Sequence, residues 1–259
     1  MTSENQSLPP AKSPWFWGVP VLASAMAILL WVTQTNQALF ILLNGAVGGE
    51  ILWSHVTLLG DALVALVLLS PFVGRRPEIL WSALLATLLA VLWVHGMKEL
   101  LQVLRPAAVL EASEIVIIGP THRLSAFPSG HSTTIFTLVG VVVVCLRQSS
   151  WAIGLLTLAA LVALSRVMVG AHWPLDILGG AFGGWLAALG GVWLNQRMPW
   201  GRGRIVQGLI GLFLAVAAVW LFQFDTGYSL AMGFQRVLAG LCLGFSVWGL
   251  WRLIRQCKD

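Results

Sequence analysis

The sequence is poor in charged residues. Only 10% of its 259 residues are Asp, Glu, Lys or Arg, whereas an ordinary globular domain carries about 25%. Hydrophobic residues make up 58% of the chain, and apolar runs of bilayer length recur along it. This pattern argues against a water-soluble globular protein and predicts an all-α fold, a polytopic bundle of transmembrane helices.

Cysteine is also scarce. The three cysteines, Cys145, Cys242 and Cys257, lie far apart and follow no metal-binding or redox spacing. Cys145 and Cys242 fall inside apolar runs, where we expect them to act as small packing residues. The net charge of +5 does not indicate a nucleic-acid partner, because the placement of charges matters more than their sum in a membrane protein.

Eight apolar runs predict eight membrane spans. They cover residues 15–33, 53–73, 79–97, 131–146, 151–169, 174–194, 205–224 and 231–253. A shorter run near 36–48 cannot cross a bilayer and predicts an interfacial helix. Residues 1–14 are expected to form a disordered cytoplasmic tail, and residues 254–259 a second cytoplasmic tail.

Two of these runs carry glycines at a spacing of four. Gly179, Gly180, Gly183 and Gly184 lie in the sixth run, and Gly240 and Gly244 in the eighth. Small residues at this spacing let helix backbones approach closely, so both runs are expected to pack tightly against neighbours.

The stretch from Ser165 to Asp176 places an arginine, a histidine and an aspartate between two apolar runs. Pro174 suits the first turn of a helix, so the sixth span is expected to begin near it. Asp176 would then accept the Nδ1–H of His172 and leave Nε2 free as a nucleophile. The pair alone is more typical of a structural hydrogen bond. The nearby Arg166 favours catalysis, because a packing histidine needs no cation beside it.

A second polar stretch, Pro128-Ser129-Gly130-His131, comes directly before the fourth span. Ser129 suits a helix N-cap, and that role alone would explain it. A helix start also attracts anions, and Gly130 would let a phosphate oxygen approach the main chain. His131 could protonate a leaving oxygen, although a lone histidine here is more often an interfacial residue.

Cations on the less favoured side of the membrane point to an anionic ligand. With the N-terminus inside, five of the fifteen Lys and Arg residues would face outward: Lys98, Arg105, Arg123, Arg166 and Arg236. The other ten would obey the positive-inside rule. Singly, Lys98, Arg105 and Arg166 could be snorkelling side chains. Together they predict a cradle for a phosphoryl group.

Three motifs combine these residues. They read Lys98-x6-Arg105-Pro106, Pro128-Ser129-Gly130-His131 and Ser165-Arg166-x5-His172-x3-Asp176. In this order and spacing they resemble the three signature motifs of the type 2 phosphatidic acid phosphatase superfamily, and no motif position departs from the pattern. The resemblance implies a six-helix phosphatase core. We place its core at residues 53–194 of a single domain over 15–253, with additional spans at 205–224 and 231–253.

The resemblance also implies a mechanism, the metal-independent hydrolysis of a lipid phosphate monoester or diphosphate through a phosphohistidine. His172 would be the nucleophile, Asp176 its orienting partner and His131 the general acid. The phosphate ligands would be Lys98, Arg105, Ser129, Gly130 and Arg166. No cofactor is implied, and the sequence has no carboxylate cluster or Cys/His set typical of a metal site.

The expected setting is a bilayer, with a membrane lipid phosphate as the substrate. The resemblance implies a bacterial inner membrane with the site on its periplasmic or outer face. Two other functions remain open: a phosphotransferase that passes the phosphate to an acceptor lipid, and a transporter or scaffold with an inactive site. The sequence assigns no role to Asp61, His95, His122 or Arg123.

Overall fold

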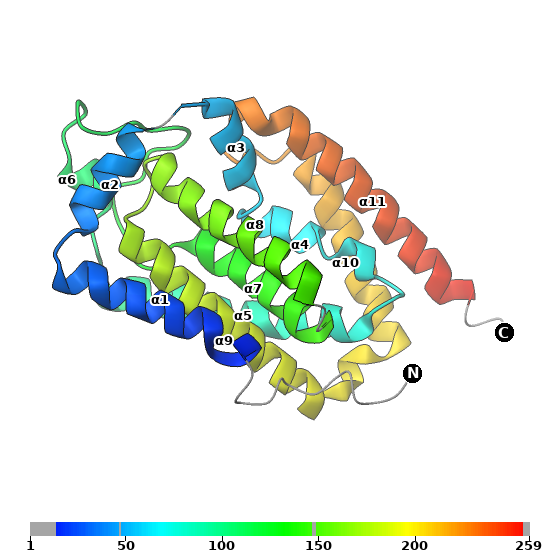
Figure 1. The fold of residues 1–259 in the computed structure, drawn as a ribbon. Helices are drawn as coiled ribbons and strands as arrows, with labels where there is room; N and C mark the ends of the chain where they lie inside the picture. Colours follow the sequence, from blue (N-terminus) through cyan, green and yellow to red (C-terminus); the bar gives the residue numbers. More distant parts are fainter. Residues whose placement is uncertain (1–13, 47, 147–148, 256–259) are drawn as a thin grey trace.

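The computed structural model describes residues 14–46, 48–146 and 149–255, whose regular secondary structure is helical and contains no strand (Figure 1). The helices are α1 (Pro14–Val32), α2 (Asn36–Gly45), α3 (Glu50–Leu58), α4 (Ala62–Val67), α5 (Pro77–Leu101), α6 (Pro106–Val109), α7 (Gly130–Leu146), α8 (Ser149–Met168), α9 (Pro174–Arg197), α10 (Arg204–Leu221) and α11 (Met232–Arg255). Three short 3-10 turns, η2 (Ser70–Phe72), η3 (Pro199–Arg202) and η4 (Ser229–Ala231), complete this part of the chain.

The helices confirm the prediction of an all-α, polytopic bundle. Within the described ranges, 5 helices are long and apolar enough to cross a membrane, or up to 7 if each of two bent pairs is one span. The fourth predicted run forms α7, an apolar helix of 17 residues. The short run near 36–48 forms α2, which is bent by 104° from α1.

The second predicted span is not one straight helix. It is divided into α3 and the α4–η2 segment, which meet at an angle of 56°. The break follows from Asp61, whose Oδ1 accepts hydrogen bonds from the main-chain N–H groups of Leu63 (2.8 Å) and Val64 (3.2 Å). An aspartate in this position caps a new helix start. Asp61, which had no assigned role in the sequence, is thus the N-cap of α4.

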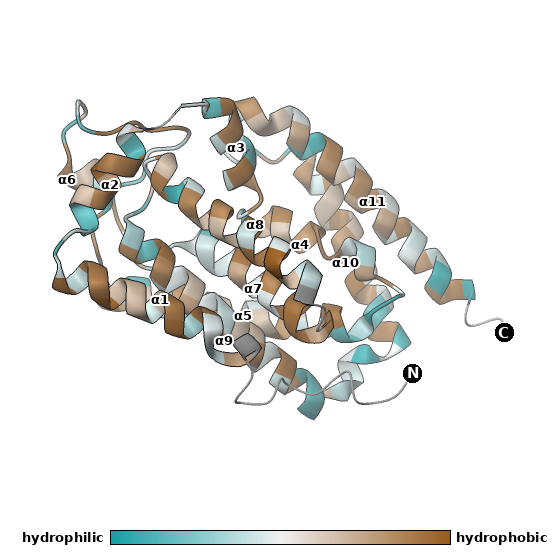
Figure 2. Ribbon diagram, in the orientation of Figure 1, coloured by the Kyte–Doolittle hydropathy of each residue, from teal (hydrophilic) through white to brown (hydrophobic). Residues whose placement is uncertain are grey.

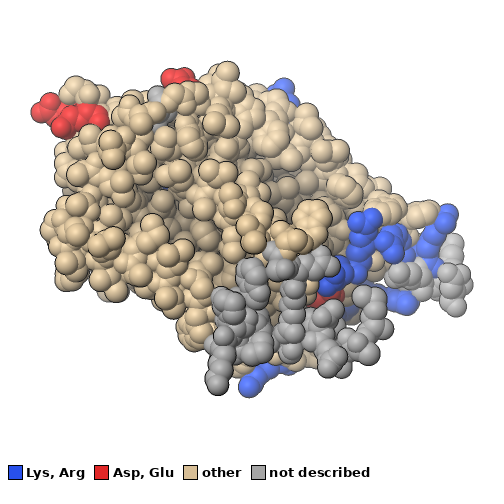
Figure 3. Space-filling view, in the orientation of Figure 1, with Lys and Arg blue, Asp and Glu red and all other residues tan. Residues whose placement is uncertain are grey.

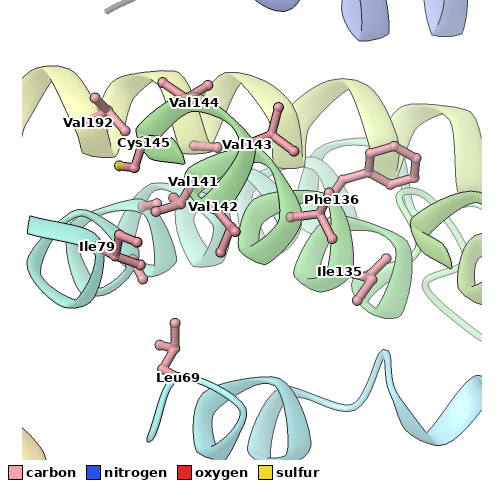
Figure 4. Packing of buried hydrophobic residues seen from close by; sticks show 14 of the residues in the cluster. Leu69, Ile79, Ile135, Phe136, Val141, Val142, Val143, Val144, Cys145 and Val192 are labelled. Atoms are coloured by element: carbon pink, nitrogen blue, oxygen red, sulfur yellow. The ribbon is translucent and has the colours of Figure 1, made fainter. Parts of the chain in front are cut away.

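Helix α7 lies at the centre of the bundle, packed against α5, α8 and α9. Its run of β-branched side chains, Val141 to Val144, is buried between these neighbours together with Phe136 (Figure 4). The glycines of α9 let α7 and α9 approach each other closely. A Cβ on Gly180, for example, would lie only 2.7 Å from the carbonyl oxygen of Ser129.

The remaining helices cover this centre. Helix α1 packs along α9, while α10 and α11 pack on each other and against α4 (Figure 1). Large apolar side chains are exposed along these outer helices, including Trp31, Leu212 and Val237. Figure 2 shows hydrophobic residues along their lengths and hydrophilic residues mostly near their ends. Such a surface suits a hydrocarbon environment.

The two predicted tails lie mostly outside the described residues, namely in 1–13 and 256–259. Helix α1 already begins at Pro14, and α11 continues to Arg255. The division into a core at 53–194 and additional spans stays a prediction.

Candidate active site

His172 and Asp176 meet at the start of α9. Helix α9 begins at Pro174, as predicted, so Asp176 lies in its first turn. The Oδ2 of Asp176 is 3.2 Å from the Nδ1 of His172 and accepts a 2.8 Å hydrogen bond from the main-chain N–H of Trp173. Both side chains are buried, with 2% of each residue exposed. A carboxylate on Nδ1 leaves Nε2 as the nitrogen available for chemistry.

Arg166 lies at the end of the preceding helix, α8. It is in the last turn of α8, and its main-chain oxygen accepts hydrogen bonds from the N–H groups of Ala171 (3.0 Å) and His172 (3.1 Å). Gly170, at φ 75°, allows the chain to turn between them. The Arg166 residue is only 3% exposed. The five-residue spacing in the third motif thus forms a tight loop that brings arginine and histidine together.

Arg105 joins this loop from the other side. Its Nη1 donates to the carbonyl oxygen of Ala171 (3.3 Å), the residue before His172, and its Nε donates to Leu124 (2.9 Å). Arg105 is buried, whereas Lys98, in the last turn of α5, is half-buried. These contacts place the first motif next to the third.

The second motif is tied to the same helix start. The main-chain N–H of Ser129 donates to the carbonyl oxygen of Asp176 (3.0 Å), and the Oγ of Ser129 accepts from the N–H of Ser132 (3.4 Å). Helix α7 begins at Gly130, so Ser129 is its N-cap as expected. A Cβ on Gly130 would meet no protein atom within 4 Å. Open space therefore lies beside this main chain.

His131 follows in the first turn of α7 and packs against Gly60, at the break between α3 and α4. A Cβ on Gly60 would lie 2.9 Å from the Cβ of His131. His131 also lines a cavity of about 530 Å³, together with Asp61, Val94, His95 and Leu138. This volume falls in the range of small-molecule and lipid-sized pockets.

The local field around His172 is strongly positive. Burial and the charges of Arg105, Arg166 and Lys98 lower the pKa of His172 well below its ordinary value of 6.5. The imidazole is therefore kept neutral, which is the form a nucleophile needs. Burial and the same three cations also lower the pKa of His122, which is an exposed loop residue near the site.

The loop that carries His122 and Arg123 is paired with the first motif. The N–H of Arg105 donates to the carbonyl oxygen of Arg123 (3.0 Å), and the N–H of Ala126 donates to Val103 (2.8 Å). Both His122 and Arg123 are exposed residues of this loop. Among the described residues, no three or more His, Cys, Asp or Glu side chains gather in a way that could hold a metal ion.

Four further residues contact the site, and none of them was predicted from the sequence. Thr57 and Tyr228 accept hydrogen bonds from Arg166. Asn36 accepts one from the N–H of Leu175 (3.0 Å), and Asn44 bonds to the main chain of Val167, the residue after Arg166, and to that of Val116. None of the four belongs to a motif. Their only sequence signal is that Tyr228 is the single tyrosine of the chain.

Comparisons with known proteins find similar sequences. A model described as "PAP2 superfamily" matches residues 79–200. The chain is 29% identical over 143 residues to an undecaprenyl-diphosphatase of Sulfolobus acidocaldarius, a match that covers 55% of this chain and 63% of that protein. It is 38% identical over 65 residues to a lipid A 1-phosphatase of Rhizobium etli, covering 25% and 27%.

A solved structure shares the fold. The crystal structure of Aquifex aeolicus LpxE matches with a TM-score of 0.56 and 28% identity, over 61% of this chain and 94% of that chain. The matches to the two curated relatives span less than two thirds of those proteins' lengths. The family model matches residues 79–200, a segment that contains all three motifs, so this part of the chain is similar to the PAP2 superfamily.

Proposed function

We propose that this protein hydrolyses a membrane lipid phosphate, either a monoester or a diphosphate, with His172 as the nucleophile. The observation that carries the proposal is the buried His172–Asp176 pair, at 3.2 Å. Arg105 donates to the carbonyl oxygen of the residue before His172, and the main-chain oxygen of Arg166 accepts from the N–H of His172. This pairing supports a neutral imidazole with its Nε2 available, next to charges suited to a phosphoryl group.

The reaction proceeds in two steps. The Nε2 of His172 attacks phosphorus, the bond from phosphorus to the leaving oxygen breaks, and His131 gives that oxygen a proton. Water then attacks the phosphohistidine, the P–N bond breaks, inorganic phosphate leaves, and the proton lost by the water returns to His131. Arg105, Arg166 and Lys98 stabilise charge on the phosphoryl oxygens, together with the main chain at Ser129 and Gly130.

A lipid substrate is supported by the surroundings of the site. The cavity of about 530 Å³ beside His131 is lined mainly by apolar residues of α4 and α5, whereas α7 contributes His131, three threonines and Leu138. The apolar wall suits a hydrocarbon chain. The relatives named undecaprenyl-diphosphatase and lipid A 1-phosphatase supply two candidate headgroups. The proposed location is the inner membrane, with the site at its outer face.

Phosphate release tests the proposal. Purified protein is incubated with undecaprenyl diphosphate, lipid A, phosphatidic acid and phosphatidylglycerol phosphate, without an added acceptor lipid. We expect release from at least one of them, and a loss of roughly a thousandfold or more in His172→Ala. The control is His55→Ala, since His55 lies on α3, where its Nδ1 is 2.6 Å from the carbonyl oxygen of Ile51 and its ring packs on that of Phe234, and it belongs to none of the three motifs. Release that requires an acceptor lipid would instead indicate a phosphotransferase.

The acid role of His131 has its own test. Protonation matters less when the leaving group is already a stable anion. His131→Ala is therefore expected to impair hydrolysis of a monoester, whose leaving group is an alcohol, more than that of a diphosphate, whose leaving group is a phosphate. An equal loss on both substrates would refute the assignment.

A further inference from the structure

Arg166 is held by two hydroxyl groups that lie outside the segment matched by the family model. Its Nη1 donates to the Oγ1 of Thr57 and to the phenolic oxygen of Tyr228, each at 2.6 Å. Thr57 lies in α3, and Tyr228 lies just before η4, in the connection between α10 and α11. All three residues are buried, with Thr57 0%, Arg166 3% and Tyr228 5% exposed.

The turn that carries Tyr228 packs closely against residues 119–120. The Tyr228 ring packs directly on Gly119, at φ 83°, where any Cβ would collide with the ring. Gly227, at φ 80°, lies equally close to Pro120, and a Cβ there would be 2.8 Å from the proline ring. Glycine is the residue that adopts this backbone conformation without strain. The α10–α11 turn can therefore pack this closely against residues 119–120 because positions 119 and 227 are glycines.

A buried glutamine stiffens the same turn. The Nε2 of Gln235, in α11, donates to the carbonyl oxygens of Leu221 and Phe224, both at 2.7 Å. Its Oε1 lies 3.0 Å from the Oγ1 of Thr226. Gln235 is 2% exposed. These bonds join both ends of the connection, so the position of Tyr228 is determined by α10 and α11 together.

The two hydroxyl contacts leave another part of the guanidinium unused. The Nε of Arg166 is buried and has no hydrogen-bond partner among the described residues. A buried, unpaired cationic donor is costly unless a ligand completes its bonding. Nη1 is held by two oxygens, and the planar guanidinium is thereby oriented. Its Nε–H edge is left for an anionic oxygen.

We propose that Tyr228 and Thr57 are positioning residues, which orient the Arg166 guanidinium for a phosphoryl oxygen at its Nε edge. The α10–α11 pair is thus part of the active site rather than an accessory to it. This inference rests on the proposed function, because it assumes that Arg166 binds the transferred phosphoryl group.

The consequence is a defect in orientation rather than in folding. An arginine that can rotate still attracts the substrate, but it stabilises the transition state less well. Tyr228→Phe and Thr57→Val each remove one hydroxyl with little change in shape. Each is expected to lower kcat by roughly 10- to 100-fold with a smaller change in KM. The inhibition constant of vanadate, a phosphoryl mimic, is expected to rise in parallel.

Matched variants separate positioning from stability. Thr57→Ser keeps a hydroxyl and is expected to restore most of the activity lost in Thr57→Val. Thr157→Val is the control on the same helix as Arg166, because the Thr157 hydroxyl donates only to the exposed carbonyl of Ile153 (2.9 Å). The double variant Tyr228→Phe/Thr57→Val should lose less than the product of the two single losses, since both act on one guanidinium. Wild-type kcat and vanadate inhibition in both single variants would overturn the inference.

A second measurement keeps this inference distinct from the proposed function. Tyr228 is the only tyrosine, so incorporation of 3-fluorotyrosine gives one ¹⁹F resonance at the site. We expect vanadate to shift this resonance in the full-length protein, and to shift it much less after Arg166→Gln. If the wild type hydrolyses none of the lipid phosphates, the proposed function fails, and the inference is then judged by this resonance alone. A resonance that vanadate does not move would overturn it.

Discussion

The carboxylate of Asp176 serves two donors at once. It accepts from the N–H of Trp173, which caps the start of α9, and it contacts the Nδ1 of His172. The indole of Trp173 is held in turn by the carbonyl oxygen of Leu104 (2.8 Å) and by the ring of Phe40 at a centroid distance of 5.0 Å. The same short turn therefore begins a helix and fixes the orientation of a buried imidazole.

The cations around His172 predict an unusual pH dependence. Burial, together with these cations, lowers the pKa of His172 below 6.5, so the imidazole stays neutral and nucleophilic in more acidic solution. The acid limb of kcat/KM is therefore expected below pH 6.5. In Arg105→Gln one of these charges is removed, and the acid limb should move upward, toward 6.5, while activity falls. The measurement is kcat/KM for phosphate release between about pH 4.5 and 8.

The control for this experiment is Arg123→Gln, which removes an exposed arginine of the neighbouring loop. Ionisation of the substrate affects every variant equally, so only the difference between variants is interpreted. An acid limb that stays in place in Arg105→Gln would contradict the electrostatic explanation.

Residues with a local signal could be predicted from the sequence, and those with only distant partners could not. The N-cap Ser129 and the carboxylate Asp176 follow from position within a helix turn. Thr57 and Tyr228 lie 109 and 62 residues from Arg166 along the chain. A threonine in an apolar run reveals nothing about which cation it will meet, because that choice is made by the packing of whole helices.

At the scale of the helix, two glycines near the start of α7 have different surroundings, one open and one tightly packed. A Cβ added at Gly130 would meet no protein atom within 4 Å, whereas one added at Gly180 would lie 2.7 Å from the carbonyl oxygen of Ser129. Gly130→Ala is therefore expected to fold normally and yet to lower kcat/KM by up to roughly 100-fold, since its methyl group displaces the phosphoryl group. Gly180→Ala should instead destabilise the fold by about 1–3 kcal/mol. Full activity in Gly130→Ala would contradict the phosphate-binding role.

Helix α2 joins two other segments of the chain through the side chain of Asn44. Asn44 is fully buried and bonds to both main-chain groups of Val116, at 2.7 and 2.9 Å, and to the carbonyl oxygens of Val167 (3.2 Å) and Met168 (3.0 Å). Asn44→Ala would leave several of these groups unpaired, at about 1–3 kcal/mol each. We expect a clear fall in the midpoint of thermal unfolding. Gln37→Ala, at an exposed position of the same helix, should leave it unchanged. Equal midpoints for the two variants would refute this stabilising role of Asn44.

The glycine pattern illustrates what a helix can and cannot reveal about its neighbours. The spacing in α9 correctly predicted close packing, as Gly180 shows. The same spacing in α11 did not, because a Cβ on Gly244 would meet nothing within 4 Å and one on Gly240 only Phe222, at 3.7 Å. The small residues give a helix the capacity for close contact, but the fold decides which helix uses it.

At the scale of the whole molecule, the all-α bundle and the proximity of the three motifs were predictable, whereas the count of eight spans was not confirmed and the link between α10–α11 and the site was not foreseen. Hydropathy identifies helices, and matching motifs identify a shared core. The turn at Tyr228 carries no motif and reaches the core only through glycines at positions 119 and 227. Its contribution could be recognised only from the assembled bundle.

The charge distribution predicts the orientation of the bundle. Arg197, Arg202 and Arg255 lie at helix ends remote from the site, and most of the visible Lys and Arg gather near the end of α11 (Figure 3). By the positive-inside rule we expect this end to face the cytoplasm and the site to face outward. The test is labelling of single cysteines, Glu111→Cys near the site and Ile205→Cys at the start of α10, after replacement of the three native cysteines. A membrane-impermeant maleimide should label position 111 in intact cells, and position 205 only after permeabilisation, because it lies at the cation-rich end. The opposite pattern would place the site on the cytoplasmic face.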